Sequence, residues 1–532
     1  MDSNQLLFAG DIPAATISSR VGRGELRQIA RGLYTVDLTT DPTTFVHRNW
    51  AAIAGRLYPD AVITDRSAIT GGPNDGYLYL AHNARERTTE LPGLTILTRT
   101  GAAPQPDDFP IPGGLHLASR GRALAENTRP SRSRGGRPAR TLTTDELAGW
   151  VNRLCQIDKE DKLSRYRVEA EAIADIVGAP ADGIKELGHL IGAALQTQTA
   201  ISNDPALNAR QAGAPYDPDR LARFDLLVAA LRSASPQHRA GIPGGHDAFA
   251  VQAFYEAYFS NFIEGTEFTL DEARKLVFED EVPVDRTADG HDVISTYRIV
   301  ADRGEMSIIP VTPQEMIDLL RSRHADLMAG RPDKDPGMFK DVSNQAGNTT
   351  FVAPDLVIGT LNEGFQRLAA LDTAWERAAY TAFLIAEVHP FIDGNGRMAR
   401  VMMNAELVAG NQSKIIVPIG ARNNYLAALR LLSRQDDPSS FIKTMRFLHD
   451  YTSQIDWTSG DVAEADLRST NGFDDERDAD TFHRITLLRP VADLVLPDPD
   501  PDPEASRNVR FVEPYERDGR MVGGYEIRRP RG

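Results

Sequence analysis

The residues from His389 to Arg400 constrain this chain more than any other stretch, because they predict a tight polar loop between two helices. They read His-Pro-Phe-Ile-Asp-Gly-Asn-Gly-Arg-Met-Ala-Arg. Upstream, Thr373 followed by Glu376 forms a capping-box pattern, which predicts the start of the first helix. Pro390 predicts its end, because the residue before a proline is pushed out of the helical region.

The second helix should begin at Asn395 or Arg397 and run to a C-cap at Gly410. Free backbone N–H groups and the helix dipole favour an anion at such an N-terminus. Gly394 and Gly396 let the backbone approach phosphate oxygens closely. The turn formed by Gly394, Asn395 and Gly396 is therefore predicted to bind a phosphate group.

Four side chains of the motif suit phosphate chemistry. Arg397 and Arg400 are expected to share a helix face, and guanidinium groups match phosphate geometry. His389 can take a proton near neutral pH, which makes it a candidate general base. Asp393 offers the hard oxygen ligand that suits Mg²⁺ bound to phosphates. A His-Pro pair alone is a helix stop and Gly-Asn-Gly alone is a turn, but all these residue types in register favour a nucleotide site.

The motif resembles the signature of the Fic family, whose members mostly transfer AMP from ATP to protein hydroxyl groups. The resemblance implies a mainly α fold, with an all-α core and a β-hairpin flap. It implies that His389 is catalytic, that Asp393 holds Mg²⁺ and that ATP is the co-substrate. It also implies adenine contacts from the helix after the motif, which we assign to Asn424 and Tyr425. The partner would be a target protein that carries a Tyr, Thr or Ser hydroxyl.

A second segment, from Ser260 to Gly265, fits the pattern [S/T]-x-x-x-E-[G/N]. In Fic proteins this pattern marks an inhibitory helix. The resemblance implies that Ser260, Glu264 and Gly265 form that segment and that Glu264 pairs with Arg400. A carboxylate held there would occupy the space that the ATP γ-phosphate needs and would repel it. The alternative is that Glu264 is an ordinary residue near a helix end, with Gly265 as its cap.

A hairpin is predicted ahead of the motif, where the Gly347-Asn348 turn lies between β-favouring residues. Fic proteins have a flap at this place. An exposed strand edge can hold a target segment by backbone hydrogen bonds, and we expect Thr350, Phe351 and Val352 to dock the target. The alternative is a plain surface hairpin.

The N-terminal segment at 16–34 has a basic start followed by an apolar and polar alternation. It resembles the winged helix-turn-helix of abortive-infection antitoxins, and a weaker resemblance continues to about residue 150. This implies binding of duplex DNA, or else a domain of the same fold that binds only protein. The expected DNA contacts, on the recognition element and around the wing, are Arg20, Arg23, Arg27 and Arg31. The arginine-rich run at 129–140 is interpreted as a flexible arm or a solvated loop.

Composition bounds the remaining possibilities. A net charge of −16 excludes a generic nucleic-acid polycation. A single cysteine, Cys155, excludes an internal disulfide framework and fits a reducing compartment. The sequence has neither a secretory signal pattern nor an apolar run of membrane-spanning length, so we predict a cytoplasmic protein without a membrane partner.

The predicted domains are a winged helix-turn-helix at 1–50, a small α/β region at 51–150, a helical connector at 151–244, a Fic core at 245–455 and an acidic, partly disordered tail at 456–532. Within the tail, the Asp-Pro run at 498–503 is low-complexity, and a small basic stretch ends the chain at 528–531.

Together these patterns predict an autoinhibited protein adenylyltransferase. One alternative is a deAMPylase or bifunctional enzyme in which Glu264 positions a water. Another is a DNA-binding transcriptional regulator whose Fic domain senses a nucleotide. A homodimer is left open.

Overall fold

The computed structural model describes residues 6–83, 86–242, 245–478, 480–491 and 494–497, together with strands at 509–512, 515–517, 520–522 and 525–528. The chain divides into two compact units, Met1–Pro215 and Tyr216–Gly532. The predicted Asp-Pro run at 498–503 and the chain end after 528 lie outside the described residues. Among those described, no helix is long and apolar enough to cross a membrane. The cytoplasmic location stays a prediction.

The first unit begins with one helix and a small antiparallel sheet in the order β1-β3-β2. The elements are β1 (Leu6–Phe8), α1 (Ala14–Gly22), β2 (Arg27–Ala30) and β3 (Leu33–Thr35). Gly32, at φ 81°, closes the β2–β3 hairpin. Over 6–35 the structure describes one helix followed by a hairpin. The second helix that a helix-turn-helix needs is not among these residues.

A six-stranded mixed sheet follows, in the order β6-β7-β5-β4-β9-β8. Its strands are β4 (Val62–Ile63), β5 (Tyr77–His82), β6 (Arg87–Leu91), β7 (Leu94–Thr100), β8 (Phe109–Ile111) and β9 (Leu115–Leu117). The helices of this region are α2 (Pro42–Leu57), α3 (Ser67–Thr70) and α4 (Arg120–Asn127). Phe45, Val46 and Ile53 of α2 pack with Leu78 and Leu80 of β5, so one face of the helix covers the sheet.

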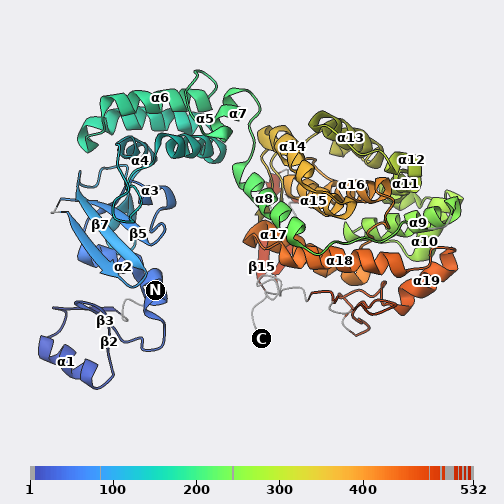
Figure 1. Ribbon diagram of the computed structural model, residues 1–532, viewed down its shortest axis with the longest axis horizontal. Helices are drawn as coiled ribbons and strands as arrows, with labels where there is room; N and C mark the ends of the chain where they lie inside the picture. The colour runs from blue at the N-terminus through green and yellow to red at the C-terminus, as the bar shows by residue number, and fades with distance from the viewer. Residues whose placement is uncertain are drawn as a thin grey trace. The chain divides into compact units, whose positions relative to one another are not determined.

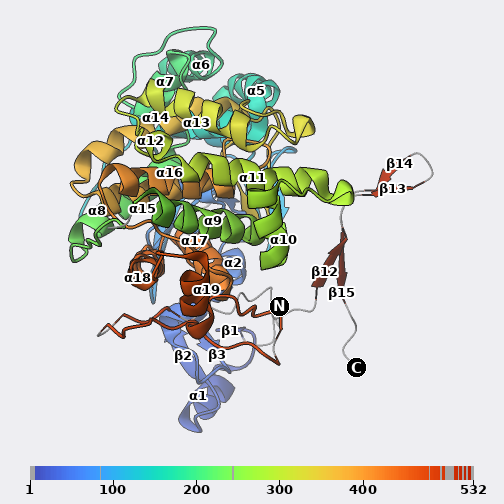
Figure 2. The same ribbon diagram turned by 90° about the vertical axis from the view of Figure 1, so that its right-hand side faces the viewer.

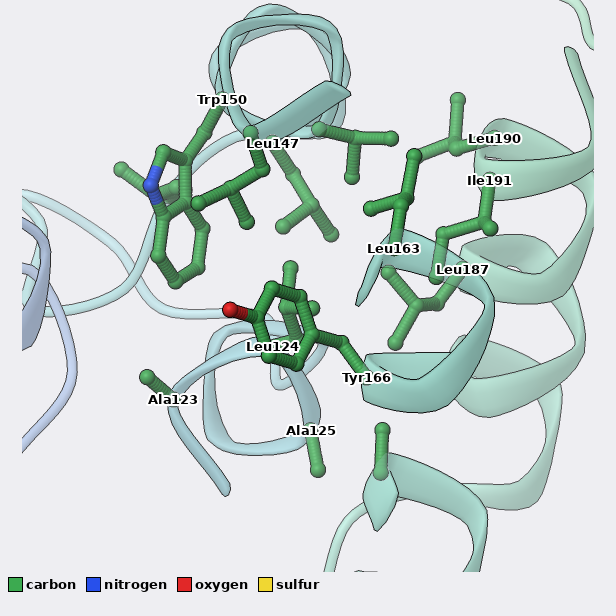
Figure 3. Packing of buried hydrophobic residues seen from close by; sticks show 14 of the residues in the cluster. Ala123, Leu124, Ala125, Leu147, Trp150, Leu163, Tyr166, Leu187, Leu190 and Ile191 are labelled. Carbon is green, nitrogen blue, oxygen red and sulfur yellow. The ribbon is translucent and has the colours of Figure 1, made fainter. Parts of the chain in front are cut away.

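Three more helices complete this unit: α5 (Thr144–Val177), α6 (Ala181–Ala194) and α7 (Pro205–Gln211). The capping box of Thr143 with Glu146 starts α5, and Gly178, at φ 66°, ends it. Figure 3 shows α4, α5 and α6 meeting in one apolar core, where Leu124 lies among Leu163, Tyr166 and Leu187.

Buried charges join the sheet to α4. Arg99 contacts Asp65 at 3.0 Å and Glu126 at 3.0 Å. Arg122 contacts Asp108 at 2.5 Å and Glu126 at 3.2 Å. All five side chains are at most 4% exposed, so each charge depends on its partners for compensation.

The second unit is mostly helical (Figure 1). Its α-helices are α8 (Pro218–Ser233), α9 (His246–Ile263), α10 (Leu270–Arg274), α11 (Thr287–Ala301), α12 (Arg303–Met306), α13 (Pro313–Leu327), α14 (Val357–Gln366), α15 (Ala374–Val388), α16 (Asn395–Ala409), α17 (Arg422–Gln435), α18 (Ser439–Gln454) and α19 (Gly460–Ser469). A π-helix covers Lys275–Glu279, and short 3-10 turns cover Val284–Arg286, Pro332–Lys334, Pro354–Leu356, Arg367–Ala370 and Ile419–Ala421.

The helices α15 and α16 pack against each other, and α9, α11 and α13 lie against α16 (Figures 1 and 2). The hairpin of β10 (Gln345–Ala346) and β11 (Thr349–Thr350) precedes them in sequence. Near the chain end, β12 (Val509–Val512) pairs with β15 (Tyr525–Arg528), and β13 (Tyr515–Arg517) pairs with β14 (Arg520–Val522). The predicted fold class is confirmed: the protein is mainly α, with an α/β region ahead of an all-α core.

The segment after residue 456, which we predicted to be a tail, begins with ordered structure. Trp457 is buried, and α19 buries Ala463 and Leu467 against this unit. The sequence of α19 shows little apolar periodicity, because polar residues fill most of this helix.

Candidate active site

The motif loop connects the ends of two helices, as the sequence predicted. α15 starts at the capping box of Thr373 with Glu376 and ends at His389, which has the left-handed φ of 53°. Gly394, at φ 74°, caps the start of α16, and Gly410 caps its end. The first N–H groups of α16 have no acceptor within their own helix, so they can meet an anion.

His389 is held as a neutral imidazole with one nitrogen available. Its Nδ1 lies 3.2 Å from the carbonyl oxygen of Ala386, which leaves Nε2 as the acceptor when Nδ1 carries the hydrogen. The pKa of His389 is lowered to about 4, mainly by burial and in small part by Lys340, while the hydrogen bond to Ala386 and the charges of Glu264 and Asp393 oppose the lowering. At neutral pH the ring is therefore unprotonated, as a general base must be.

Glu264 lies at the N-terminus of α16. Its Oε1 is 2.6 Å from Nη2 of Arg400. A Cβ placed on Gly396 would come within 2.2 Å of the same carboxylate oxygen, so a larger residue there would displace the Glu264 carboxylate. A phosphate would be favoured at this helix end, beside the Arg400 guanidinium. The Glu264 carboxylate occupies that place.

Arg400 is fixed by α9. Its Nε donates to the Ser260 hydroxyl at 2.9 Å, and its Nη2 donates to the Ser260 carbonyl at 2.8 Å. Glu264 is the C-cap of α9, and Gly265 follows at φ 92°. Ser260 thus lies in the last part of α9, Glu264 at its C-cap and Gly265 just after it, and both Ser260 and Glu264 contact Arg400. An inhibitory role for this segment stays a prediction.

Arg397 does not lie where we expected it. It is 3% exposed, and its Nη1 is 2.7 Å from Asp292 of α11. Residues three apart on an α-helix point about 60° apart, which lets Arg397 turn to Asp292 while Arg400 turns to Glu264. In this conformation Arg397 is not among the residues that line the cavity.

Asn395 shapes the loop by closing a ring with Phe391. Its Oδ1 accepts from the Phe391 N–H at 2.9 Å, and its Nδ2 donates to the Phe391 carbonyl at 2.8 Å. These bonds fix the orientation of the amide, and the second hydrogen on Nδ2 stays available as a donor. Phosphate contacts from this turn can therefore come from the backbone N–H groups and from the Asn395 amide.

Asp393 is the accessible carboxylate of the loop. Its side chain is 45% exposed, and Oδ1 accepts from the Gly394 N–H at 2.6 Å. Among the described residues no group of three or more His, Cys, Asp and Glu side chains could hold a metal. Mg²⁺ that is bound mainly by phosphates needs only one or two carboxylates, so Asp393 fits that mode.

The β10–β11 hairpin lies beside the base. The rings of Phe351 and His389 are stacked, with centroids 3.7 Å apart and planes at 5°. Thr350 is exposed, whereas Val352 is 1% exposed. The Val352 side chain therefore packs inward, so it would not contact a target itself, and docking of a target through the backbone of this segment stays a prediction.

A cavity of about 410 Å³ joins these parts. Its lining includes Glu264, Phe351, His389 and Arg400, together with a stripe of α17 that starts at Tyr425. Asn424 does not take part: its Nδ2 donates to the Pro497 carbonyl at 2.6 Å. Of the two predicted adenine contacts, only Tyr425 is among the residues that line the cavity. The remaining α17 lining residues are Leu426, Leu429, Arg430, Ser433 and Arg434.

Two residues that fix the hairpin and the loop were missed by the sequence reasoning. Lys340 Nζ donates to Asn344 Oδ1 at 2.6 Å, and burial lowers the Lys340 pKa to about 7. Asn344 Nδ2 donates to the Phe391 carbonyl at 2.9 Å. Neither residue belongs to a motif, and the contact that ties the hairpin to the loop joins Asn344 to Phe391, 47 positions away.

His324 supports the same loop from α13. Its ring is stacked on Phe391, with centroids 3.6 Å apart and planes at 2°. Nδ1 accepts from the Gly337 N–H at 2.9 Å, and Nε2 contacts the Asp393 carbonyl at 3.0 Å. Both nitrogens are therefore engaged, and burial lowers the pKa of His324 to about 4.

The arginines predicted to contact DNA are mostly engaged within the first unit. Arg20 and Arg23 contact Glu25 at 3.4 Å and 2.7 Å. Arg27 donates to the carbonyl oxygens of Leu38 and Thr40. Only Arg31, exposed on the hairpin turn, has no partner among the described residues.

A more basic surface lies elsewhere in the first unit. The run at 129–140 packs on the sheet, where Arg66 Nε donates to the Ala139 carbonyl at 3.1 Å and the Tyr79 hydroxyl donates to the Pro138 carbonyl at 3.2 Å. The cleft that it forms measures about 660 Å³. Its arginines are Arg87, Arg132, Arg134, Arg137 and Arg140.

Comparison with known proteins agrees with the site. Residues 314–407, which include the motif, match the model of the Fic/DOC family. The protein adenylyltransferase Fic of Drosophila persimilis is 27% identical over 283 residues, which cover 49% of this chain and 52% of that protein. The protein adenylyltransferase fic-1 of Caenorhabditis briggsae is 25% identical over 189 residues, which cover 34% of this chain and 37% of that protein.

Among solved structures, Fic-1 (residues 134–508) from C. elegans matches with a TM-score of 0.34 and 18% identity, covering 62% of this chain and 90% of that one. The chain spans about half or less of the length of the two curated relatives, 52% and 37%.

Proposed function

We propose that this protein is an autoinhibited protein adenylyltransferase, which transfers AMP from ATP to a hydroxyl group of a target protein. The observation that carries the proposal is the position of the Glu264 carboxylate, 2.6 Å from Arg400 and directly over Gly396. An anion-binding helix end next to a neutral imidazole suits nucleotide transfer. A carboxylate already bound at that end suits inhibition, because it repels phosphate.

In the proposed reaction, His389 Nε2 takes the proton of the target hydroxyl, whose oxygen attacks the α-phosphorus of ATP in line. The bond from that phosphorus to the bridging oxygen breaks, and pyrophosphate leaves. Backbone N–H groups of Asn395 and Gly396 would stabilise the charge that develops on the phosphate. Arg400, once free of Glu264, would hold the terminal phosphates. Asp393 would hold Mg²⁺, which supplies charge neutralisation on the phosphates when bound.

Labelled ATP tests the proposal. The wild-type chain, Glu264→Gly and Glu264→Gly with His389→Ala are each incubated with ATP labelled at the α-phosphate and with a cell lysate. Label should appear on protein, increase in Glu264→Gly and disappear in the double variant. Glu267→Gly is the matched control, because Glu267 is an exposed carboxylate that contacts Arg477 at 2.6 Å outside the cavity. No protein label in any variant would contradict the proposal.

Removal of AMP is a second candidate, favoured by the fact that Glu264 and His389 line the same cavity. There Glu264 would position a water for attack on an AMP-modified side chain. A modified protein from the Glu264→Gly reaction is the substrate. Release of AMP by the wild-type chain, and its loss in Glu264→Gly, would assign this activity to Glu264.

We also propose that the first unit binds duplex DNA, as a regulator would. The supporting observation is that Arg87, Arg132 and Arg134 have no ion-pair partner among the described residues, although they line one cleft. Binding should weaken steeply with salt. In a mobility-shift assay with the full chain, the double variant Arg132→Ala with Arg134→Ala should no longer retain DNA. The double variant Arg20→Ala with Arg23→Ala tests the recognition element that the sequence predicted. No shift at low salt would refute DNA binding. A homodimer stays a prediction.

A further inference from the structure

We infer that Phe351 is a positioning residue for the base: its ring fixes the plane of the His389 imidazole and makes the competence of the base depend on the hairpin. This inference rests on the proposed adenylyl transfer. The target-docking role that the sequence suggested for Phe351 stays a separate prediction.

The stacking geometry supports an orienting role. Centroids 3.7 Å apart with planes at 5° describe close parallel contact over one face of the imidazole. Proton transfer uses the lone pair of Nε2, which lies in the ring plane and points outward from the edge. Because Phe351 covers a face and not that edge, it restrains the ring without blocking a hydroxyl. The stacking fixes the plane of the ring. The contact of Nδ1 with the Ala386 carbonyl, at 3.2 Å, fixes the rotation of the ring within that plane.

The hairpin that carries Phe351 is anchored on both sides. The Phe351 N–H donates to the Asn344 carbonyl at 3.2 Å, and the Asn344 side chain binds the motif loop through the Phe391 carbonyl at 2.9 Å. On the other side, Arg434 Nε of α17 donates to the Thr349 hydroxyl at 2.9 Å. Arg220 of α8 donates to the Thr350 carbonyl.

These anchors connect the base to the surface that a target would meet. A target strand that pairs with the exposed hairpin edge would act on the same segment that holds Phe351. Movement of the hairpin away from α17 would also withdraw the aromatic ring from His389. Base orientation and target engagement are thus linked through one short segment.

Several charged groups act on the His389 imidazole. Lys340 Nζ lies 5.9 Å from the Phe351 ring centroid, and Glu264 and Asp393 also act on His389. Glu387, two residues earlier on α15, is bound by Arg220 at 2.5 Å. Burial is the largest cause of the lowered pKa of His389. Removing the Phe351 ring would expose the imidazole and raise its pKa toward the ordinary value of about 6.5.

The test uses full-length chains that carry Glu264→Gly, so that the proposed inhibition does not mask the effect. Phe351→Leu keeps apolar bulk and removes the flat ring, Phe351→Tyr keeps the ring, and Phe109→Leu is the matched control at a side chain 59% exposed in the first unit. Self-labelling from α-labelled ATP is measured from pH 4 to pH 9, together with ATP affinity by calorimetry.

Phe351→Leu should reduce the labelling rate at pH 8 by about tenfold or more, since small misplacements of a catalytic group are costly. Its ATP affinity should change less than about twofold, because the ring contacts the base and not the helix end that binds phosphate. The acid limb of its pH profile should also shift to higher pH. Phe351→Tyr should restore the rate to within about threefold, and Phe109→Leu should have no effect.

Equal labelling by Phe351→Leu and its parent, with the same acid limb, would overturn the inference. An equal loss in Phe351→Tyr would overturn it as well, since the ring is kept there. Absence of label in the Glu264→Gly parent, in the lysate as well as on itself, would instead overturn the proposed adenylyl transfer.

Discussion

Replacing Glu264 by glycine should tighten the binding of ATP far more than that of ADP. The carboxylate contacts Arg400 at 2.6 Å and lies over Gly396, where a terminal phosphate would be bound. ADP lacks the γ-phosphate, so the excluded space matters less to it. The difference between the two nucleotides isolates the contact from any general loosening of α9.

The magnitude follows from the surroundings of the pair. A hydrogen bond to a charged group contributes about 1.5–3 kcal/mol. The Arg400 side chain is 5% exposed and that of Glu264 is 32% exposed, which favours the lower half of this range. Since about 1.4 kcal/mol corresponds to a factor of ten, ATP affinity should rise by about ten- to fortyfold.

The assay is calorimetry on chains that also carry His389→Ala, so that nucleotide is not consumed. Four titrations are compared: ATP and ADP, each with the chain that keeps Glu264 and with the chain that carries Glu264→Gly. Glu267→Gly serves again as the carboxylate control. Equal gains for ATP and ADP, or no gain for ATP in a folded protein, would refute the reasoning that Glu264 occupies the γ-phosphate space.

Four further outcomes are expected. His389→Ala should abolish AMP transfer while ATP affinity stays within about threefold, because the imidazole acts on the incoming hydroxyl; calorimetry beside a labelling assay checks this. Because the His389 pKa is lowered to about 4, its base form is complete well above that pH, so wild-type transfer should be flat from pH 6 to 8 and fall only as pH approaches 4. Asp393→Asn should raise the Mg²⁺ concentration needed for half-maximal transfer without changing thermal stability, since the side chain is 45% exposed. Arg99→Met should destabilise the first unit by about 3–5 kcal/mol by leaving Asp65 and Glu126 buried without it, and denaturant unfolding measures that loss.

The helices around the motif could be predicted because their signals are local. Thr373 with Glu376, the proline after His389 and the cap at Gly410 each act within one turn of the chain, and α15 and α16 begin and end there. The pair of Glu264 with Arg400 joins residues 136 positions apart. Only the resemblance to a family suggested it, since no local pattern encodes such a contact.

Side-chain directions could not be predicted, because they depend on distant partners. Arg397 turns to Asp292 of α11, and Asn424 turns to the carbonyl of Pro497. Val352 packs inward although its neighbour Thr350 is exposed. In all three cases the rotation of the side chain is set by tertiary packing, which residue type and spacing do not encode.

The left-handed backbone of His389 has a consequence for how loss-of-function variants are made. At φ 53° a residue with a side chain usually adds about 1–2 kcal/mol of conformational strain, and asparagine and glycine tolerate this region best. An alanine there removes the imidazole but still bears the strain, without the contact that Nδ1 makes. His389→Asn should therefore be the better inactive protein, since it can keep the turn and the helix end while it lacks the base. The melting temperatures of His389→Ala and His389→Asn would show how much residue 389 contributes to the stability of the turn, apart from its role as a base.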